Sequence, residues 1–454
     1  MRCCSYLVTH RLARGGWIAI NGLSGAVDLL DDATKGILDA PPADGPADPE
    51  LLSRLRQRGY LFADQDEEER LFLAMWERQK RLSQDRPLQF VLCPTHSCNL
   101  ACRYCFEGSI TSRAPRVLGD EAIVAAFRAM DEIAARTPSR KREVDLFGGE
   151  PLLPSTLGAV RKSLREAETR GMGVGVVTNG THLATGYREL ILEFRHLFSH
   201  FQITVDGPQT IHDYRRPFRS GKGSHGAALE AVELLVSLGI RVAVRVNLDA
   251  HNVAYLPEIA EMIVRRGWPE QPNFRCVLAP VADHLGTGSY PALLPEDQLV
   301  RDLAEVMAAS ESARRLFRLD LFRSAKHLSG VLGLASLKGQ PMLQYCEANG
   351  LHSYTFGADG CIYPCSEMLD QPELAIGSFF PSFEIDEGKA APWRDRSIVA
   401  MPECRSCRVA TFCGGGCAYQ ALKRSGSPME PACYGAEKVI SAFLECFGDR
   451  LSPQ

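Results

Sequence analysis

Three cysteines close together in the chain have the spacing of iron ligands. Cys98, Cys102 and Cys105 follow the order C-x3-C-x2-C, directly after an apolar stretch at 88–92 that is typical of a strand. Iron–sulfur clusters are held by cysteine thiolates, usually four of them. Three thiolates on one short loop suit three irons of a cubane cluster and leave the fourth iron open for a ligand from outside the protein. Zinc favours paired C-x2-C spacings, so a zinc site, or three structural thiols, fits the triplet less well.

A second group of cysteines lies near the end of the chain, where seven of the sixteen cysteines are regularly spaced. Cys346 and Cys365 flank Gly360 in the order C-x13-G-x4-C. In a reducing compartment, so many clustered cysteines point to metal sites rather than disulfides. A pair of zinc knuckles is the alternative. The other five follow as C-x2-C-x5-C-x3-C and a final cysteine: Cys404, Cys407, Cys413, Cys417 and Cys433.

Alternating strands and helices follow the triplet and predict the scaffold that positions it. Strands separated by helices imply a parallel sheet with covered faces. Six such units predict an α/β fold, a partial (β/α)6 barrel open on one side, whose chemistry sits at the carboxyl ends of the strands. The expected strands are 88–92, 143–147, 174–177, 201–205, 241–247 and 274–278. The expected helices are 120–136, 155–170, 186–195, 226–238, 256–266 and 295–309.

Polar motifs follow the predicted strands at that same edge. Gly148-Gly149-Glu150-Pro151 comes directly after the second strand. Its glycines let a ligand approach the backbone closely, and its carboxylate can accept an ammonium; a plain Gly-Gly turn is the alternative. Thr178-Asn179-Gly180 follows the third strand, and Thr204-Val205-Asp206-Gly207-Pro208 follows the fourth. Asp206 suits a simple Asp-Gly turn equally well, and Asn247 at the end of the fifth strand suits a strand cap.

The triplet, with Tyr104 within it and Phe106 after it, resembles the cluster loop of the radical S-adenosylmethionine (SAM) superfamily. The resemblance implies that the open iron chelates the amino and carboxylate groups of SAM. It also implies that an electron from the cluster cleaves SAM, and that the resulting deoxyadenosyl radical abstracts a substrate hydrogen. The motif around Glu150 would hold the methionine amino group. The residues carried over as SAM or substrate contacts are Tyr104, Gly148, Gly149, Glu150, Pro151, Asn179, Thr204, Arg216 and Asn247.

The seven later cysteines resemble the SPASM extension of radical SAM enzymes, which carries two auxiliary [4Fe–4S] clusters. The resemblance assigns Cys346, Cys365 and Cys417 to the first auxiliary cluster. Cys361 is the candidate for its fourth ligand, and an open iron that binds substrate sulfur is the alternative. With the cluster of the triplet, the chain is expected to hold three [4Fe–4S] clusters and SAM. The ligands expected for the second auxiliary cluster are Cys404, Cys407, Cys413 and Cys433.

Residues 1–85 precede the cluster loop and have the pattern of a separate α+β module. Short strands joined to helices resemble the winged-helix peptide-recognition element of peptide-modifying enzymes. Such an element would bind a leader peptide as an added edge strand; a structural cap on the barrel is the alternative. The expected domains are this module at 1–85, the barrel at 86–310, a linker at 311–340 and the SPASM domain at 341–454.

These features predict a peptide maturase that forms a thioether, C–C or C–O crosslink in a ribosomally made peptide or protein. Flavodoxin or ferredoxin is the expected reductant. The alternative enzyme is an anaerobic sulfatase maturase that makes formylglycine. Such maturases carry an aspartate base directly after the cysteine of the G-x4-C motif, where this chain has Ser366 followed by Glu367. A non-catalytic iron–sulfur electron carrier is the alternative from another class, and the sequence assigns no residue as the base that takes the substrate proton.

Composition limits the remaining possibilities. The formal net charge of −4 implies no broad nucleic-acid footprint. No apolar run of membrane-spanning length occurs, and Met1-Arg2-Cys3-Cys4-Ser5 lacks the apolar core of a signal peptide. A cytoplasmic enzyme with no membrane or nucleic-acid partner is therefore expected.

Overall fold

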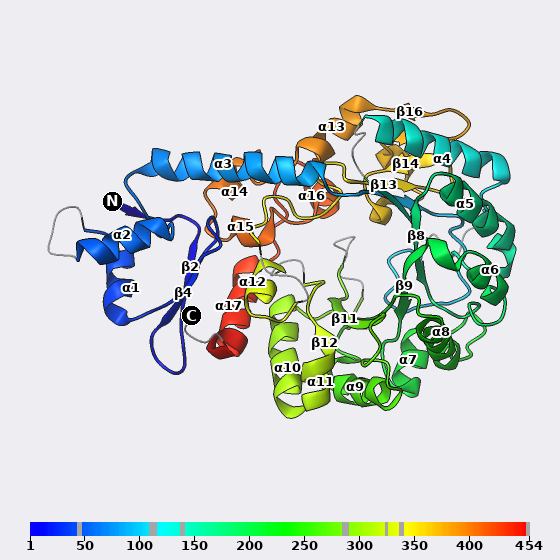
Figure 1. Cartoon of the computed structure of the whole chain (residues 1–454), viewed down its shortest axis with the longest axis horizontal. Helices are drawn as coiled ribbons and strands as arrows, with labels where there is room; N and C mark the ends of the chain where they lie inside the picture. The colour runs from blue at the N-terminus through cyan, green and yellow to red at the C-terminus, as the bar shows by residue number, and fades with distance from the viewer. Residues whose placement is uncertain are drawn as a thin grey trace.

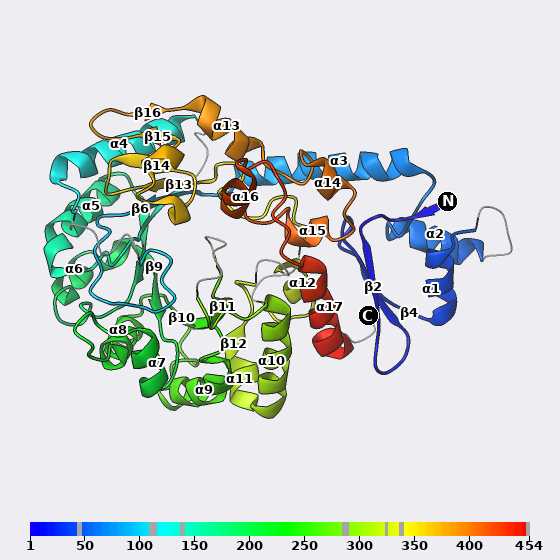
Figure 2. The same ribbon diagram turned by 180° about the vertical axis from the view of Figure 1, so that it is seen from behind.

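The computed structural model describes residues 1–42, 48–108, 116–136, 141–283, 290–322, 326–335 and 340–450. Figure 1 shows an elongated molecule with the N-terminal segment at one end and a curved sheet wrapped by helices at the other. The C-terminal segment lies between them, and the same arrangement is seen from behind in Figure 2.

The N-terminal segment holds a three-stranded antiparallel sheet in the order β2-β3-β4, beside the short pair β1–β5. The central strand β3 is the most buried because Ile18, Ala19 and Ile20 are enclosed on both sides. Helix α3 then runs from this segment across to the barrel (Figure 1). The bounds are β1 Arg2–Cys3, β2 Leu7–Arg11, β3 Trp17–Asn21, β4 Val27–Leu30, α1 Asp32–Asp39, α2 Pro49–Gln57, β5 Leu61–Phe62 and α3 Gln65–Gln84.

Six parallel strands, β6 to β11, form the barrel wall in chain order, as predicted. Apolar side chains fill the space between this sheet and the helices outside it. The strands are β6 Leu88–Leu92, β7 Arg142–Leu146, β8 Gly173–Thr178, β9 Phe198–Thr204, β10 Val242–Leu248 and β11 Phe274–Pro280. The helices are α4 Asp120–Ala135, α5 Leu157–Thr169, α6 Arg188–Glu193, α7 Gln209–Arg215, α8 His225–Ser237, α9 Leu256–Arg265 and α10 Glu296–Ala309.

The C-terminal segment extends the barrel sheet instead of forming a detached domain. Strand β13 (Ser353–Phe356) pairs in parallel with β6, and β14 (Cys361–Tyr363) continues as an antiparallel hairpin. The sheet described here therefore contains eleven strands, in the order β12-β11-β10-β9-β8-β7-β6-β13-β14-β15-β16. The remaining elements are β15 Gly377–Ser378, β16 Glu384–Ile385, α13 Glu387–Asp395, α14 Pro402–Arg405, α15 Ala410–Cys413, α16 Ala418–Ser425 and α17 Ala436–Phe447.

The stretch expected to be a linker, 311–340, is largely built into the fold, although 323–325 and 336–339 lie outside the described residues. It holds α11 (Glu311–Leu316), β12 (Phe317–Arg318) and α12 (Lys326–Val331). Strand β12 pairs with β11 through Cys276 and Val277 and so forms one edge of the sheet. Its two residues are too few to show a strand period in the sequence.

The first and last parts of the chain share a hydrophobic core. Tyr6 and Phe72 of the N-terminal segment pack with Leu343, Ile398 and Met401 of the C-terminal segment. The Tyr6 hydroxyl also donates a 2.6 Å hydrogen bond to the carbonyl of Arg405. The N-terminal module is thereby attached to the segment that carries the later cysteines.

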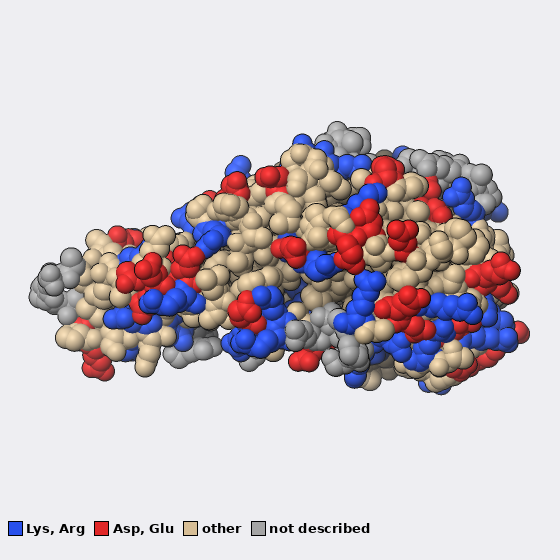
Figure 3. All heavy atoms as spheres, turned by 90° about the horizontal axis from the view of Figure 1, so that it is seen from above, with Lys and Arg blue, Asp and Glu red and all other residues tan. Residues whose placement is uncertain are grey.

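Surface charge is mixed on the face shown in Figure 3, where acidic and basic side chains are interspersed. Within the described ranges, no helix combines the length and apolar character needed to cross a membrane.

Candidate iron–sulfur and SAM site

The cysteine triplet lies on the loop that leaves β6 at its carboxyl end. The segment after α7 holds this loop in place: Ala101 N donates to the carbonyl of Pro217 at 2.9 Å, and Arg103 N donates to the carbonyl of Arg215 at 3.0 Å. From the other direction, Arg219 N donates to the carbonyl of Asn99 at 2.9 Å. Backbone hydrogen bonds to residues more than a hundred positions later in the chain therefore hold the loop in place.

The three thiols lie within electrostatic reach of one another. Burial, together with the charges of Glu150 and Cys102, raises the pKa of Cys98 to about 12. Burial, and then Cys102, likewise raises the pKa of Cys105. Protein groups alone do not stabilise these thiolates, so a positively charged iron centre fits this set of donors. Among the described residues, no three His, Cys, Asp or Glu groups converge as a single ion requires. A cluster differs in that each thiolate binds its own iron.

The Gly148-Gly149-Glu150-Pro151 turn packs directly against the cysteine loop. Gly148 has φ +120°, and a Cβ on it would lie 2.3 Å from Cys93 Sγ. A Cβ on Gly149 would lie 2.3 Å from the carbonyl oxygen of His96. Glu150 N donates to the carbonyl of Ser97 at 2.8 Å, so the turn and the loop share a backbone bond. Only glycine permits this approach at both positions.

The Glu150 side chain joins this turn to the next strand end. Its carboxylate accepts hydrogen bonds from Leu152 N at 2.9 Å, Thr178 Oγ1 at 2.6 Å and Asn179 N at 2.7 Å. Burial raises the pKa of Glu150, whereas these three bonds and Arg216 oppose the rise. The Asn179 side chain then reaches back to Asn99 Oδ1 at 2.8 Å and lies 4.0 Å from Cys98 Sγ.

Tyr104 lies at the centre of a polar network that joins three strand ends. Its hydroxyl accepts from Arg216 Nη1 at 2.6 Å and from Asn247 Nδ2 at 3.1 Å, and it donates to Asp206. Cys102 is the charge that acts most on the pKa of Arg216, which places this guanidinium beside the cysteine loop. Asp206 accepts from Asn247 N at 2.8 Å, so it makes polar contacts beyond those of a simple turn. Thr204 ends β9 and is buried at the same edge.

Sequence reasoning missed a buried ion pair beneath this network. Arg215 pairs with Asp249, both side chains are fully buried, and Tyr290 Oη donates to Asp249 at 2.7 Å. The Arg215 guanidinium lies 4.8 Å from the centre of the Tyr104 ring, where it supports the ring from one face. The position of Asp249 just after β10 could have marked it as a site residue. Its partner, Arg215, is brought to it by helix α7, which the sequence does not reveal.

The later cysteines separate into the two groups that the SPASM resemblance implies. The charges of Cys346 and Cys417 act on Cys365. Separately, burial and the charges of Cys413, Cys433 and Cys407 together raise the pKa of Cys404 to about 12. The structure therefore brings three of the first set together and all four of the second. Cys361 differs, because the neighbours that act most on its pKa are Asp359, Tyr363 and Asp370 rather than cysteines.

The three glycines between Cys413 and Cys417 connect the segments that carry these groups. A Cβ on Gly414 would lie 2.7 Å from backbone of Gln344, two residues before Cys346. A Cβ on Gly415 would lie 2.3 Å from Met401 Cε, and one on Gly416 would lie 2.1 Å from the carbonyl oxygen of Ala432. All three have positive φ angles. The run therefore brings the segments before Cys346, Cys404 and Cys433 into direct contact.

Two acidic residues follow the cysteines of different groups and interact electrostatically. Glu107, two residues after Cys105, is buried, and this burial together with the charge of Glu367 raises its pKa to about 8. Glu367, two residues after Cys365, also acts on the pKa of that cysteine. The triplet loop and the first auxiliary group are thus neighbours, which their sequence separation does not reveal.

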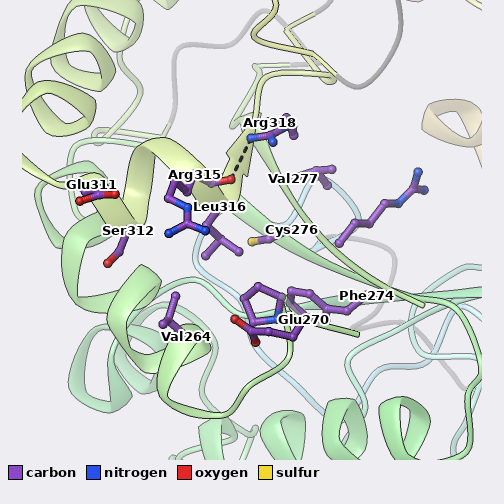
Figure 4. Close-up of a pocket in the computed structure, with 12 residues that line it drawn as sticks. Val264, Glu270, Phe274, Cys276, Val277, Glu311, Ser312, Arg315, Leu316 and Arg318 are labelled. Atoms are coloured by element: carbon purple, nitrogen blue, oxygen red, sulfur yellow. Dashed lines mark hydrogen bonds between the residues drawn. The ribbon is translucent and has the colours of Figure 1, made fainter. Parts of the chain in front are cut away.

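A cavity of about 620 Å³ lies away from this chemistry. Figure 4 shows that its wall includes Phe274 and Cys276, at the end where the chain enters β11, and Arg315 and Leu316 from α11. The cysteine loops lie at the opposite, carboxyl end of the strands, so this cavity is not part of the candidate site.

A partial barrel with three cysteines after its first strand and a Gly-Gly-Glu-Pro turn after its second is the fold and site of a radical SAM enzyme. In agreement, residues 92–263 match the Radical SAM superfamily. Residues 92–263 of the chain are therefore a radical SAM domain, and the chain is an enzyme. The α/β fold class and the resemblance are confirmed, and a non-catalytic electron carrier is not supported.

Two curated relatives are similar over most of this chain. The serine-type anaerobic sulfatase-maturating enzyme of Klebsiella aerogenes is 24% identical over 387 residues, which are 79% of this chain and 83% of the relative. The PqqA peptide cyclase of Ruegeria pomeroyi is 27% identical over 371 residues, which are 79% of this chain and 91% of the relative.

Two solved structures share the fold. Native anSMEcpe with bound AdoMet has a TM-score of 0.62 and 19% identity, and the match covers 80% of this chain and 98% of that one. Streptococcus suis SuiB bound to precursor peptide SuiA has a TM-score of 0.55 and 14% identity, and the match covers 94% of this chain and 98% of that one.

Proposed function

We propose that this enzyme is a maturase that abstracts hydrogen from a ribosomally made peptide or protein and forms a crosslink. The observation that carries the proposal is the meeting of the cysteine triplet, the Glu150 turn and the Tyr104 network at one end of the barrel, beside a second cysteine segment. The names of the curated relatives support a peptide or protein substrate, since one is a peptide cyclase and the other a sulfatase-maturating enzyme.

The proposed cofactors are SAM and three [4Fe–4S] clusters. Cys98, Cys102 and Cys105 hold the first cluster, and the later cysteines hold the two auxiliary clusters in the groups described above. When bound, the first cluster and SAM supply an electron and a deoxyadenosyl radical for hydrogen abstraction. Arg216 and Asn247 orient Tyr104 beside the SAM site, and Glu150 rigidly joins the two strand ends that enclose it.

The N-terminal module is proposed to bind the leader part of the substrate. Strands β2 and β4 are the two edges of the three-stranded sheet, with α17 against β2 and α1 against β4. An extended peptide would pair with one of these two edges. The fold likeness to SuiB supports this role because it extends over 94% of the chain and so includes the module. The electron donor is proposed to be a flavodoxin or a ferredoxin, and the proposed compartment is the cytoplasm.

Formylglycine formation is the second candidate function. Two similar proteins, from Klebsiella aerogenes and Klebsiella pneumoniae, are both named serine-type anaerobic sulfatase-maturating enzymes. Ser366 stands where those enzymes are expected to carry an aspartate base. Glu367 is the nearest acidic residue in sequence, and its charge acts on Cys365. In this candidate Glu367 takes the place of the aspartate.

The test is anaerobic reconstitution of the full chain with SAM, dithionite and the short peptides encoded in neighbouring reading frames. A crosslinking maturase should produce deoxyadenosine and a peptide that has lost two hydrogens, with no aldehyde that reacts with a hydrazine. The variant Cys102→Ala should form no deoxyadenosine, because one iron of the SAM cluster loses its ligand. An aldehyde product would favour formylglycine formation, and deoxyadenosine without any change in the peptides would contradict the crosslinking proposal for them.

A further inference from the structure

Arg396 is a fully buried cation in the C-terminal segment. Its guanidinium donates only to backbone carbonyls: Nη1 to Pro428 and, at 2.7 Å, to Glu430; Nη2 to Gly415 at 2.9 Å and to Gly416 at 3.2 Å. In the described part of the chain, no carboxylate forms an ion pair with it, and its Nε has no hydrogen-bond partner. A buried charge without an opposite charge costs several kcal/mol, so an anion is required nearby.

The bonds of Arg396 place it between the two groups of auxiliary cysteines. Gly415 and Gly416 lie between Cys413 and Cys417, and Glu430 lies three residues before Cys433. Arg396 therefore contacts segments from both groups at once. The anions that act on it are thiolates of both groups as well: Cys417 and Cys346 from the first, Cys404 and Cys413 from the second. Burial lowers the pKa of Arg396, and these four thiolates oppose that change.

We propose that Arg396 is the shared counter-cation of the two auxiliary clusters and raises the reduction potentials of both. The inference rests on the proposed function, because it requires both clusters. Three or four thiolates would give a [4Fe–4S] cluster a net negative charge, and reduction would add one more electron. A fixed cation in a buried site would therefore favour the reduced state.

A purely structural role makes a different prediction, so two substitutions distinguish the roles. Arg396→Lys keeps the positive charge but loses the planar fork that bonds several carbonyls. Arg396→Gln keeps some hydrogen-bond donors and loses the charge. If the positive charge of Arg396 sets the reduction potentials, only Arg396→Gln should change them. If the hydrogen bonds of Arg396 are what matter, both variants should lose iron to the same extent.

The experiment uses the full chain with Cys98, Cys102 and Cys105 all replaced by alanine, so that only auxiliary clusters contribute signals. Iron per chain and the midpoint potentials from a redox titration followed by electron paramagnetic resonance are measured. The background protein should hold about eight irons per chain, as expected for two [4Fe–4S] clusters. Arg396→Gln should make both potentials more negative, by a factor of about ten in the reduction equilibrium, or about 59 mV for one electron. Arg396→Lys should stay close to the background values.

Arg424→Gln is the control, because it removes one positive charge from an exposed position at the end of α16. It should leave both potentials unchanged. Unchanged potentials in Arg396→Gln, or equal shifts in the Lys and Gln variants, would overturn the inference. Equal iron loss from both variants would do the same. If the protein lacking Cys98, Cys102 and Cys105 holds no iron, the proposal of auxiliary clusters is overturned. Formation of deoxyadenosine by the unmodified enzyme would still support the proposed radical chemistry.

Discussion

At the scale of single residues, Asp145 is a partly buried carboxylate in the barrel wall, three residues before Gly148. Its Oδ2 accepts a 2.6 Å bond from Gln89 Nε2. Its Oδ1 has no hydrogen-bond partner among the described residues and lies 3.9 Å from His200 Nε2. A Cβ on Gly175 would lie 1.9 Å from that oxygen, so glycine is required beside it. Burial raises the pKa of Asp145 to about 6, and the charge of Glu143 adds to the rise.

This raised pKa predicts a pH dependence of stability. Between the unfolded pKa of about 3.9 and the folded pKa of about 6, the folded state holds a proton that the unfolded state has released. The free energy of unfolding therefore falls as pH rises through this window and is constant above it. Asp145→Asn removes the decline and should stabilise the protein at pH 7 by on the order of 1–3 kcal/mol.

The check is to compare the thermal midpoints of the two proteins between pH 5 and pH 8. The advantage of Asp145→Asn should grow up to pH 7 and then stay constant. The exposed substitution Asp120→Asn serves as a control for loss of one negative charge. An advantage that does not change with pH would show that Asp145 does not titrate in this window.

At the scale of elements, the glycine run 414–416 has the same importance for the later cysteines as the Gly148-Gly149 turn has for the triplet. In each case a short segment without side chains lets a neighbouring ligand-bearing loop approach to contact distance. Strand ends and tight turns are therefore the elements that determine the geometry of all three cysteine groups.

Gly416→Ala tests this role. Its Cβ would lie 2.1 Å from the carbonyl oxygen of Ala432, next to Cys433, and it would impose a methyl group at φ +76°. The variant should lose at least half of its auxiliary iron, as measured by iron per chain after anaerobic reconstitution. Gly426→Ala is a matched control, because it has φ +80° but nothing within 4 Å of the added atom. Equal iron content in both variants would mean that backbone strain, and not the close approach, is what the substitution changes.

At the scale of the whole molecule, the chain closes on itself twice. Strand β13 continues the barrel sheet beside β6, and the N-terminal segment packs against the segment that carries Cys404 and Cys407. The N-terminal module and the segment with Cys404 and Cys407 therefore share one hydrophobic cluster. A change at either end of the chain is expected to affect the other.

Tyr6→Ala should reveal this connection. It removes a ring that stacks on Phe72 at 5.4 Å and the hydrogen bond to the Arg405 carbonyl, and should cost about 3 kcal/mol of stability. Because Arg405 follows Cys404, iron should also leave the variant faster when a chelator is added. Tyr255→Ala, at a 36% exposed position on the barrel, should behave like the unmodified protein. Equal rates of iron loss in all three proteins would show that the module does not support the cysteine segment.

The sequence alone determined the cysteine groups, the strand-end motifs and the order of the barrel elements. These features depend on the spacing of residues and on the periodicity of hydrophobic residues within a short stretch of the chain, so the sequence is enough to recognise them. It indicated Tyr104, Arg216 and Asn247 through resemblance, and the structure brings all three together. Only the tertiary structure decided the pairing of β13 with β6, the electrostatic interaction of Glu107 with Glu367, and the position of Arg396 between two cysteine groups. Each joins segments far apart in the chain, and no local period encodes which distant segments will pack against each other.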